Sequence, residues 1–348
     1  MKRLKNPHRK IRKILVRSTN WIGDAIMTTP AVRAIRKNFP HAQITMLAKP
    51  WVAPVFSHSP HVDEIMFYDE RNVHKGVRGK IQLIKDLHAQ NFDLAILLQN
   101  AIEAAILAHF AGIPNIVGFN TDGRSLLLTH SVPCTKEIKQ IHQTKYYVKM
   151  LEGVGLKNDG YDLDLYVGNQ DRQHAYKFLC SIEKKSDIKW VGMNPSATYG
   201  NAKQWFPERF AQLADIICSE YNAGILIFGG PNDFELGEKV KHMMKHPALN
   251  LAGKTTLGQA IALIQQCKVF VTNDSGLMHI ACALKTPLVA IFGSTNPITT
   301  GPIGINSHIV QKLTPCSPCL KTDCPKQHHE CMDAISAESV FKTVKDLF

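Results

Sequence analysis

The sequence predicts an α/β protein with two doubly wound parallel sheets, one in each half of the chain. The first observation is a strict alternation of strand-like and helix-like segments, which runs from residue 12 to residue 170 and restarts at residue 189. The second is that strand segments such as residues 92–98 are apolar throughout, which is typical of parallel strands buried on both faces. The third is a polar, glycine-containing break at residues 158–170, where we place the link between two Rossmann-like domains.

In the first half, apolar runs and turn residues define the elements. Strands are predicted at residues 13–17, 44–48, 64–68, 92–98 and 115–119. Helices are predicted from the turn at residue 24 through residue 39, and at residues 79–90, 101–111 and 142–155. Ile81, Ile84 and Leu87 share one face of their helix, and Gly112 and Gly155 end the two helices that precede them.

The second half repeats the pattern. Strands are predicted at residues 189–193, 225–228, 269–271 and 288–292. Helices are predicted at residues 207–220, 234–245, 257–267, 276–284 and 336–348. The expected domains are therefore residues 1–165 and 166–335, followed by the helix at 336–348. Right-handed crossovers gather the strand-end loops of each domain on one sheet edge, and two domains facing each other would form a cleft.

The composition indicates a globular, cytoplasmic protein with a polyanionic partner. The 348 residues carry a formal net charge of +12, from 41 Lys and Arg and 29 Asp and Glu. Nucleic acid, an anionic membrane surface or a phosphorylated substrate would suit that charge, and the alternative is a solvated basic tail with no partner. No apolar run reaches the roughly 18 residues of a membrane span, and no apolar segment follows the basic N-terminus as in a secretory signal. The basic tail, residues 2–12, contains no Phe, Tyr or Trp, which argues against a nucleic-acid binder.

The central candidate site is the segment Val-Thr-Asn-Asp-Ser-Gly-Leu-Met-His at residues 271–279. It follows a strand and opens a helix near Gly276, so it lies at the carboxyl edge of a sheet, where ligands bind in open α/β folds. The N–H groups and positive dipole end of that helix suit a diphosphate. The alternative is an ordinary helix start with Asp274 or Ser275 as N-cap.

A second candidate is the turn after the first strand. Gly23 allows a tight turn, and Asp24 follows it at the strand-end edge. A carboxylate there could act as a general base toward a substrate hydroxyl. The alternative is that Asp24 caps the following helix, in which Pro30 fits either a kink or a late start.

Two loops of the second half carry further polar side chains. Ser196, Thr198 and Lys203 are suited to phosphate oxygens, although their spacing is not that of a P-loop, and a solvated polar loop is the alternative. A glycine pair after the next strand is followed by Asp233, whose carboxylate could accept hydrogen bonds from both hydroxyls of a ribose. The Gly-x-Gly-x-x-Gly fingerprint is missing in both halves, which argues against a hydride-transfer enzyme.

Four of the nine cysteines cluster late in the chain, at Cys316, Cys319, Cys324 and Cys331. Four thiols in one short stretch could hold zinc tetrahedrally. The spacing from Cys324 to Cys331 is too long for a zinc knuckle, however, and no second Cys-x-x-Cys is present. We therefore expect no metal and an irregular loop of reduced thiols, with zinc as the alternative.

Together these motifs resemble glycosyltransferase family nine, the heptosyltransferases of lipopolysaccharide inner-core assembly. The resemblance rests on the order and spacing of Gly23-Asp24 with Thr29-Pro30, Lys203-Gln204-Trp205, Gly229-Gly230-Pro231, the segment 273–279 and the cysteine segment. It covers nearly the whole chain from residue 13 onward. It implies a GT-B fold, in which the N-terminal domain binds the acceptor, the C-terminal domain binds the sugar nucleotide, and the last helix packs back on the N-terminal domain.

The resemblance also implies roles for individual residues. Asp24 corresponds to the catalytic base, Lys203 to the phosphate-binding lysine and Asp233 to the acidic residue that contacts the donor ribose. The turn that meets the diphosphate corresponds to Asp274, Ser275, Gly276 and Leu277, with His279 behind it. Lys203 and the amides of this turn would neutralise the leaving diphosphate without a metal or other cofactor.

The implied reaction is the inverting transfer of L-glycero-D-manno-heptose from ADP-heptose onto the first heptose of the lipopolysaccharide inner core. The basic N-terminal region would suit a lipid-linked core acceptor and a peripheral position on the anionic cytoplasmic face of the inner membrane. Another transferase of the family, of the heptosyltransferase I or III type, or another GT-B sugar-nucleotide enzyme, is the alternative.

Overall fold

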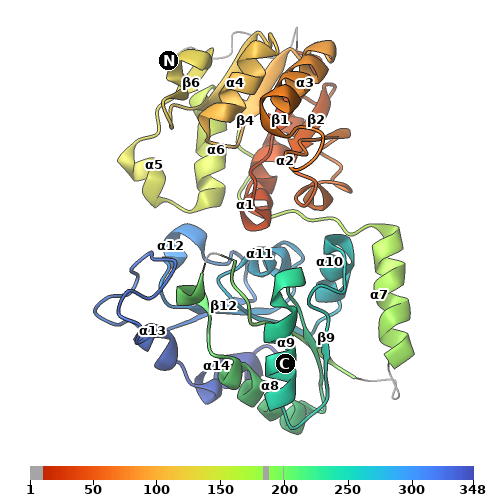
Figure 1. Ribbon diagram of the computed structural model, residues 1–348, viewed down its shortest axis with the longest axis vertical. Coiled ribbons are helices and arrows are strands. Elements are labelled where there is room, and N and C mark those ends of the chain that lie inside the picture. The colour runs from red at the N-terminus through yellow and green to blue at the C-terminus, as the bar shows by residue number, and fades with distance from the viewer. Residues whose placement is uncertain (1–10, 183–187, 199) are drawn as a thin grey trace. The chain divides into compact units, whose positions relative to one another are not determined.

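The computed structural model describes residues 11–182, 188–198 and 200–348 (Figure 1). The described residues divide into two compact units, with the boundary between Tyr166 and Val167. Each unit holds one six-stranded sheet in which every neighbouring pair of strands is parallel. The predicted α/β class with two doubly wound parallel sheets is confirmed.

The sheet of the first unit has the strand order β3-β2-β1-β4-β5-β6. Its strands are β1 (Lys13–Arg17), β2 (Gln43–Ala48), β3 (Glu64–Phe67), β4 (Leu94–Leu97), β5 (Asn115–Phe119) and β6 (His130–Val132). The short strand β6 was not predicted. The order reverses between β1 and β4, and in doubly wound sheets ligands bind beside the carboxyl ends of the strands at such a switch point.

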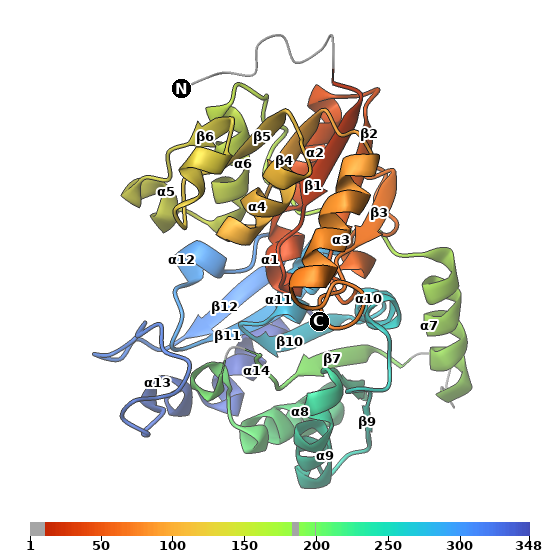
Figure 2. The ribbon, with the colours of Figure 1, turned by 45° about the horizontal axis from the view of Figure 1, so that its top comes forward.

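Helices cover both faces of the first sheet. They are α1 (Ile22–Met27), α2 (Thr29–Asn38), α3 (Gly76–Ala89), α4 (Ile102–Phe110), α5 (Lys136–Gln140) and α6 (Gln143–Gly153), with the 3-10 turns η1 (Ala53–Val55) and η2 (Arg124–Leu127). Helices α3 and α4 lie side by side over one face (Figure 2) and bury their apolar residues with Leu15, Leu47 and Leu97 of the sheet. The segment from residue 24 to 39, expected to form one helix, is divided into two helices, because the helix is interrupted at Thr28. Pro30 lies in the first turn of α2, where the N–H group that proline lacks would have no partner within the helix.

The sheet of the second unit has the order β12-β11-β10-β7-β8-β9, which is the same topology. Its strands are β7 (Trp190–Asn194), β8 (Gly224–Ile227), β9 (Ala248–Asn250), β10 (Val269–Asn273), β11 (Leu288–Phe292) and β12 (Ser307–Gln311). The two edge strands, β9 and β12, were not predicted, because they are short or expose polar residues and lack a continuous apolar run.

The second unit contains eight α-helices and two 3-10 turns among its described residues. The helices are α7 (Asn169–Ile182), α8 (Pro207–Tyr221), α9 (Phe234–Met243), α10 (Leu257–Gln265), α11 (Gly276–Ala283), α12 (Pro297–Thr300), α13 (Glu330–Asp333) and α14 (Ala337–Lys345), and the turns are η3 (Asn201–Lys203) and η4 (Pro231–Asp233). Helix α7 was not predicted, and its first residues lie within the segment that we expected to be a linker.

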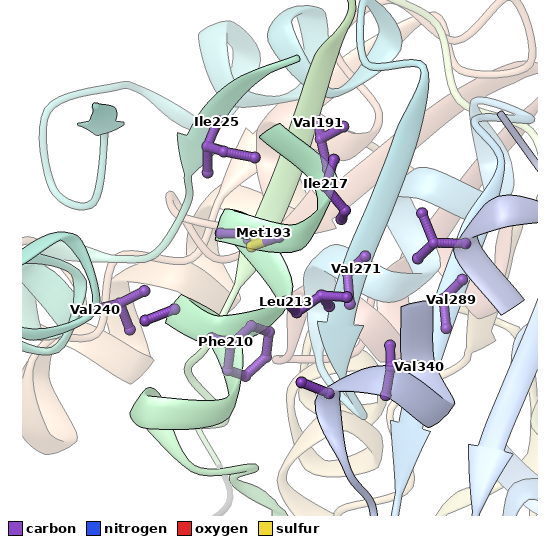
Figure 3. Close-up of a cluster of buried hydrophobic side chains, with 14 of the residues drawn as sticks. Val191, Met193, Phe210, Leu213, Ile217, Ile225, Val240, Val271, Val289 and Val340 are labelled. Atoms are coloured by element: carbon purple, nitrogen blue, oxygen red, sulfur yellow. The ribbon is translucent and has the colours of Figure 1, made fainter. Parts of the chain in front are cut away.

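The core of the second unit includes the C-terminal helix. Val191 and Met193 of β7 pack with Phe210 and Leu213 of α8, and Val340 of α14 lies in the same cluster (Figure 3). We expected this helix to pack on the first domain, but its buried residues Ala337, Val340 and Val344 belong to the core of the second unit. The reason is that its single apolar face fills the space between α8 and the β11–β12 end of the sheet.

Removing the apolar contact of α14 should destabilise the second unit. We expect Val340→Ala to lower the free energy of unfolding by roughly 2 kcal/mol, because it deletes buried methyl groups and leaves a cavity. Lys342→Ala on the exposed face of the same helix should change it by less than about 0.5 kcal/mol. Urea denaturation followed by circular dichroism measures both, and equal stabilities would show that the helix contributes little to the core.

Candidate active site

The turn between β10 and α11 has the geometry of an anion-binding helix start. Ser275 is the N-cap of α11 in extended conformation (φ −149°, ψ 170°), and its hydroxyl accepts a hydrogen bond from the N–H of Met278 at 3.4 Å. The capping alternative for Ser275 is therefore correct. It does not exclude an anion site, because the N–H groups of Gly276 and Leu277 belong to the first turn, where no intrahelical acceptor exists.

A buried ion pair joins this turn to the loop that follows β7. The ammonium of Lys203, at the end of η3, lies 2.7 Å from Oδ2 of Asp274. The Asp274 side chain is 5% exposed and the Lys203 side chain 15%. Lys203 and the first turn of α11, which the sequence analysis assigned to the same ligand, are thus neighbours in the structure.

The side chain of Asn273, at the end of β10, holds both ends of that loop. Its Oδ1 accepts a hydrogen bond from the N–H of Trp205 at 3.0 Å, and its Nδ2 donates to the carbonyl of Pro195 at 2.8 Å. Asn273 is fully buried, so these bonds are not exchanged with water. They fix the polar residues of the loop relative to the α11 turn.

A hydrogen-bond network continues from α11 across the sheet edge to η4. Asn194, the last residue of β7, donates to the hydroxyl of Ser275 at 2.9 Å. The hydroxyl of Ser196 donates to Oδ2 of Asp233 at 3.0 Å, and the same oxygen accepts the N–H of Gly230 at 2.7 Å. Asn194 was not predicted as a site residue. It is a polar residue at the end of a strand, as Asn273 is, and this position could have identified it from the sequence.

Two other predicted residues have different surroundings. Thr198 is exposed in the loop after β7, and the bonds described above do not include it. His279 is buried at 4% exposure on α11, beyond the first turn. The structure therefore brings together Ser196, Lys203, Asp233, Asp274 and the N-terminus of α11, whereas Thr198 lies at the surface of the loop.

Asp24 belongs to the first unit and lies in the first turn of α1. The N-cap of that helix is Trp21, which makes no side-chain capping bond, so the alternative reading of Asp24 as the N-cap is wrong. Asp24 is partly buried and lies near Tyr147 of α6. Burial raises the pKa of Tyr147 well above its ordinary value, and the negative charge of Asp24 raises it further.

Two buried cations lie at the carboxyl ends of the neighbouring strands in the first unit. Arg17 ends β1 and Lys49 follows β2, and the guanidinium carbon and the ammonium nitrogen lie 5.4 and 3.5 Å from the centroid of the Tyr68 ring. Burial lowers the pKa of Arg17 to about 10 and also lowers the pKa of Lys49. Sequence analysis missed both residues, because one basic residue at a strand end carries no motif.

Three residues of the cysteine cluster, Cys316, Cys319 and Cys324, lie in the irregular loop between β12 and α13, and Cys331 lies in α13 itself. All four thiols of the cluster line one pocket together with Ser294, which follows β11. Burial raises the pKa of Cys331, and the other three thiols raise it further. Burial alone would raise the pKa of Cys324 as well, but the nearby backbone N–H groups of residues 326–329 favour its thiolate and lower that pKa overall.

Comparison with known proteins identifies relatives along nearly the whole chain. The family model described as glycosyltransferase family 9 (heptosyltransferase) matches residues 80–330. Lipopolysaccharide heptosyltransferase 2 of Escherichia coli is 29% identical over 343 residues, which cover 96% of this chain and 98% of that protein. Lipooligosaccharide heptosyltransferase 2 of Haemophilus ducreyi is 30% identical over 86% of this chain and 89% of that protein.

Solved structures agree with these relatives. The structure of ADP-heptose lps heptosyltransferase II of Escherichia coli superposes with a TM-score of 0.82 at 27% identity and covers 96% of this chain and 98% of that one. A glycosyl transferase family 9 structure from Veillonella parvula gives a TM-score of 0.86 at 25% identity, with 97% of both chains covered. The similarity therefore extends through both units.

Breaking the ion pair at the α11 turn should cost stability. We expect Asp274→Asn to lower the free energy of unfolding by about 3 kcal/mol, because it removes the carboxylate that faces a mostly buried ammonium. The control is Glu208→Gln in the exposed Lys239–Glu208 pair, whose side chains are 52% and 51% exposed and whose loss should cost less than about 1 kcal/mol. Chemical denaturation measures the free energy of unfolding of both variants. A similar decrease in both would contradict the assignment of Lys203–Asp274 as a buried ion pair.

Proposed function

This chain belongs to glycosyltransferase family 9, and we propose that it transfers L-glycero-D-manno-heptose from ADP-heptose to the first heptose of a lipopolysaccharide inner core. The names of the relatives, heptosyltransferase 2 of lipopolysaccharide and of lipooligosaccharide, support the donor sugar and the acceptor class. The observation that carries the proposal is the position of Lys203 beside the first turn of α11. That arrangement suits a diphosphate whose negative charge increases as the sugar leaves.

The diphosphate of the donor would bind at the N-terminus of α11. The N–H groups of Gly276 and Leu277 point along the positive end of the helix dipole. Lys203, which Asp274 holds in place, keeps further ammonium N–H donors that could bond phosphate oxygens. These groups are already in place before the reaction, so they stabilise the leaving ADP without reorganisation. Thr198, exposed in the same loop, would add a hydroxyl to the phosphate contacts, whereas the hydroxyl of Ser196 already donates to Asp233 and would hold that carboxylate beside the phosphate site.

The ribose of the donor would bind at Asp233. Its Oδ2 is occupied by the hydroxyl of Ser196 and the N–H of Gly230, which orients the second oxygen, Oδ1, as an acceptor for ribose hydroxyls. Glycine is needed at position 229, because an added Cβ there would lie 2.7 Å from the Cβ of Asp233. The glycine pair thus lets the ribose-binding carboxylate lie close to the backbone.

Asp24 would act as the general base. It lies in the first turn of α1, which follows β1 at the switch point of the first sheet. Its carboxylate would take the proton of the acceptor hydroxyl, the oxygen would form a bond to the anomeric carbon, and the bond from that carbon to the ADP oxygen would break with inversion. Arg17 adds positive charge at the same edge of the sheet, which suits an acidic core acceptor, whereas the ammonium of Lys49 is already paired with Glu70.

We also propose that the protein contacts an anionic membrane peripherally, where its lipid-linked acceptor lies. No helix of the described part of the chain is long and apolar enough to cross a membrane. The basic residues 2–10, from which we first inferred this contact, lie outside the described residues. Among the described residues, helices α3 and α4 carry five exposed apolar side chains: Val77, Ile81, Ile102, Ile106 and Phe110. We call these residues the α3–α4 surface.

Charge complementarity supports a membrane as the partner of the α3–α4 surface. Helix α3 and its N-cap present the exposed cations Lys75, Arg78 and Lys85 beside the apolar side chains. The ion pair between Lys80 and Glu103, at 2.6 Å, joins the two helices that carry the surface. Apolar residues flanked by lysine and arginine are typical of segments that lie in the interface of an anionic bilayer.

The transfer reaction is tested by ADP release with ADP-heptose and a core acceptor that already carries one heptose. We expect turnover by the wild type and a loss of roughly 10²- to 10⁴-fold in Asp24→Asn, which keeps the side-chain shape but cannot accept the proton. Glu137→Gln, an exposed change in the same unit, should retain the wild-type rate. Unchanged turnover in Asp24→Asn would place the base elsewhere, and no turnover by the wild type on this acceptor would contradict the proposed substrates.

Membrane contact is tested by sedimentation with vesicles that contain phosphatidylglycerol. Phe110 is 65% exposed, and we expect Phe110→Glu to weaken binding at least tenfold, about 1.4 kcal/mol, because it removes an apolar anchor and adds a repelled charge. The control is Ile298→Glu, a 71% exposed residue of the second unit, which should bind as the wild type does. Equal binding of Phe110→Glu and wild type would exclude this surface.

A further inference from the structure

The four late cysteines line one pocket although they are spread over residues 316–331. Cys316, Cys319, Cys324 and Cys331 are all among the residues around it. None of the nine cysteines forms a disulfide in the structure. The spacing argued against a zinc knuckle, but the irregular path of the loop and the start of α13 place all four cysteines around one pocket.

The loop that carries Cys316, Cys319 and Cys324 is long and has no regular secondary structure. Residues 312–329, between β12 and α13, contain no helix or strand. Loops longer than about 15 residues without secondary structure are uncommon in compact domains unless a function or a cross-link accounts for them. Several apolar residues in and beside this loop, such as Leu313 at 79% and Leu320 at 59% exposure, face solvent instead of a core.

We propose that Cys316, Cys319, Cys324 and Cys331 bind one thiolate-preferring metal ion, zinc or iron, in a structural site. Four sulfur ligands satisfy the tetrahedral geometry that both ions adopt in such sites. On binding, the four thiols release four protons to solvent and the ion releases its water molecules. No redox step and no further reactant are involved.

Charge and geometry of the pocket fit this assignment. A divalent ion with four thiolates carries a net charge of −2, and the pocket lining also contains Lys326 and two histidines, His328 and His329. In the described part of the chain no three Cys, His, Asp or Glu side chains are already assembled as a metal centre. The ion would therefore draw the three thiols of the irregular loop toward that of Cys331 in α13, and the binding free energy would order the loop.

The loop is hydrogen-bonded to the η3 turn that carries Lys203 and to the segment after β11. The carbonyl of Thr322 accepts the N–H of Ala202 at 3.0 Å, one residue before Lys203, and the N–H of Leu320 donates to the carbonyl of Ser294 at 2.8 Å. At Gly200, φ is +137° and an added Cβ would lie 2.2 Å from the Thr322 carbonyl oxygen, so the contact needs glycine. A metal in the loop would hold the turn that carries Lys203 in position. The importance of this effect rests on the proposed function of Lys203, whereas the metal site itself does not rest on it.

The site is tested by elemental analysis of the full chain purified under reducing conditions without added metal. We expect about one zinc or iron per chain in the wild type. Cys316→Ser and Cys331→Ser should each lose most of it, whereas Cys180→Ser, an exposed cysteine of α7 outside the loop, should retain it. The ratio of zinc to iron identifies the ion.

A second measurement covers the case in which the serine variants do not fold. Wild-type protein stripped with a chelator and kept reduced should take up one equivalent of zinc, and four thiols should then become unreactive to Ellman's reagent. Absence of metal in the purified protein together with no zinc uptake would overturn the site, as would metal that remains in both loop variants. A Cys316–Cys319 disulfide in protein kept reduced would also overturn it. Because these readouts need no substrate, they stand apart from failure of the transferase assay.

Discussion

The arrangement of the second unit's site depends on the fully buried side chain of Asn273. Its amide contacts the backbone at Pro195 and at Trp205, so one residue at the end of β10 fixes both ends of the loop that follows β7. Hydrogen bonds of this kind are strong in a low-dielectric interior and costly to leave unmade. These two hydrogen bonds fix the position of the loop relative to the α11 turn. The ion pair between Lys203 and Asp274 therefore has a single defined geometry.

The main elements of the fold were predictable because buried parallel strands are continuous apolar runs. The central strands β1, β4, β7, β10 and β11 follow this pattern, and all were predicted. The edge strands β9 and β12 and the helix α7 were missed, since packing against neighbours rather than a run of apolar residues defines them. The position of α14 was also mispredicted, because an amphipathic pattern shows that a helix packs but not on which partner.

The candidate site was predictable to the extent that chemistry followed a strand end in a recognisable motif. Asp24, Lys203, Asp233 and the turn at residues 274–277 were found in this way, although their roles remain predictions. Asn194 and the two buried cations Arg17 and Lys49 were not found, because a single polar or basic residue at a strand end carries no motif. The pocket lined by the four cysteines shows the same limit. Their spacing gives only how far apart they are along the sequence, whereas the path of the backbone decides which of them lie close together.

The two units share one strand order, and each has its own sheet and hydrophobic core. A change in the loops of one unit therefore leaves the packing of the other intact. Under the proposed function, one half of the chain recognises the acceptor and the other recognises the donor. Natural variation can then alter the sugar that is extended while the nucleotide-binding half is inherited unchanged, so a family with this architecture can build different core oligosaccharides by stepwise evolution of a single half.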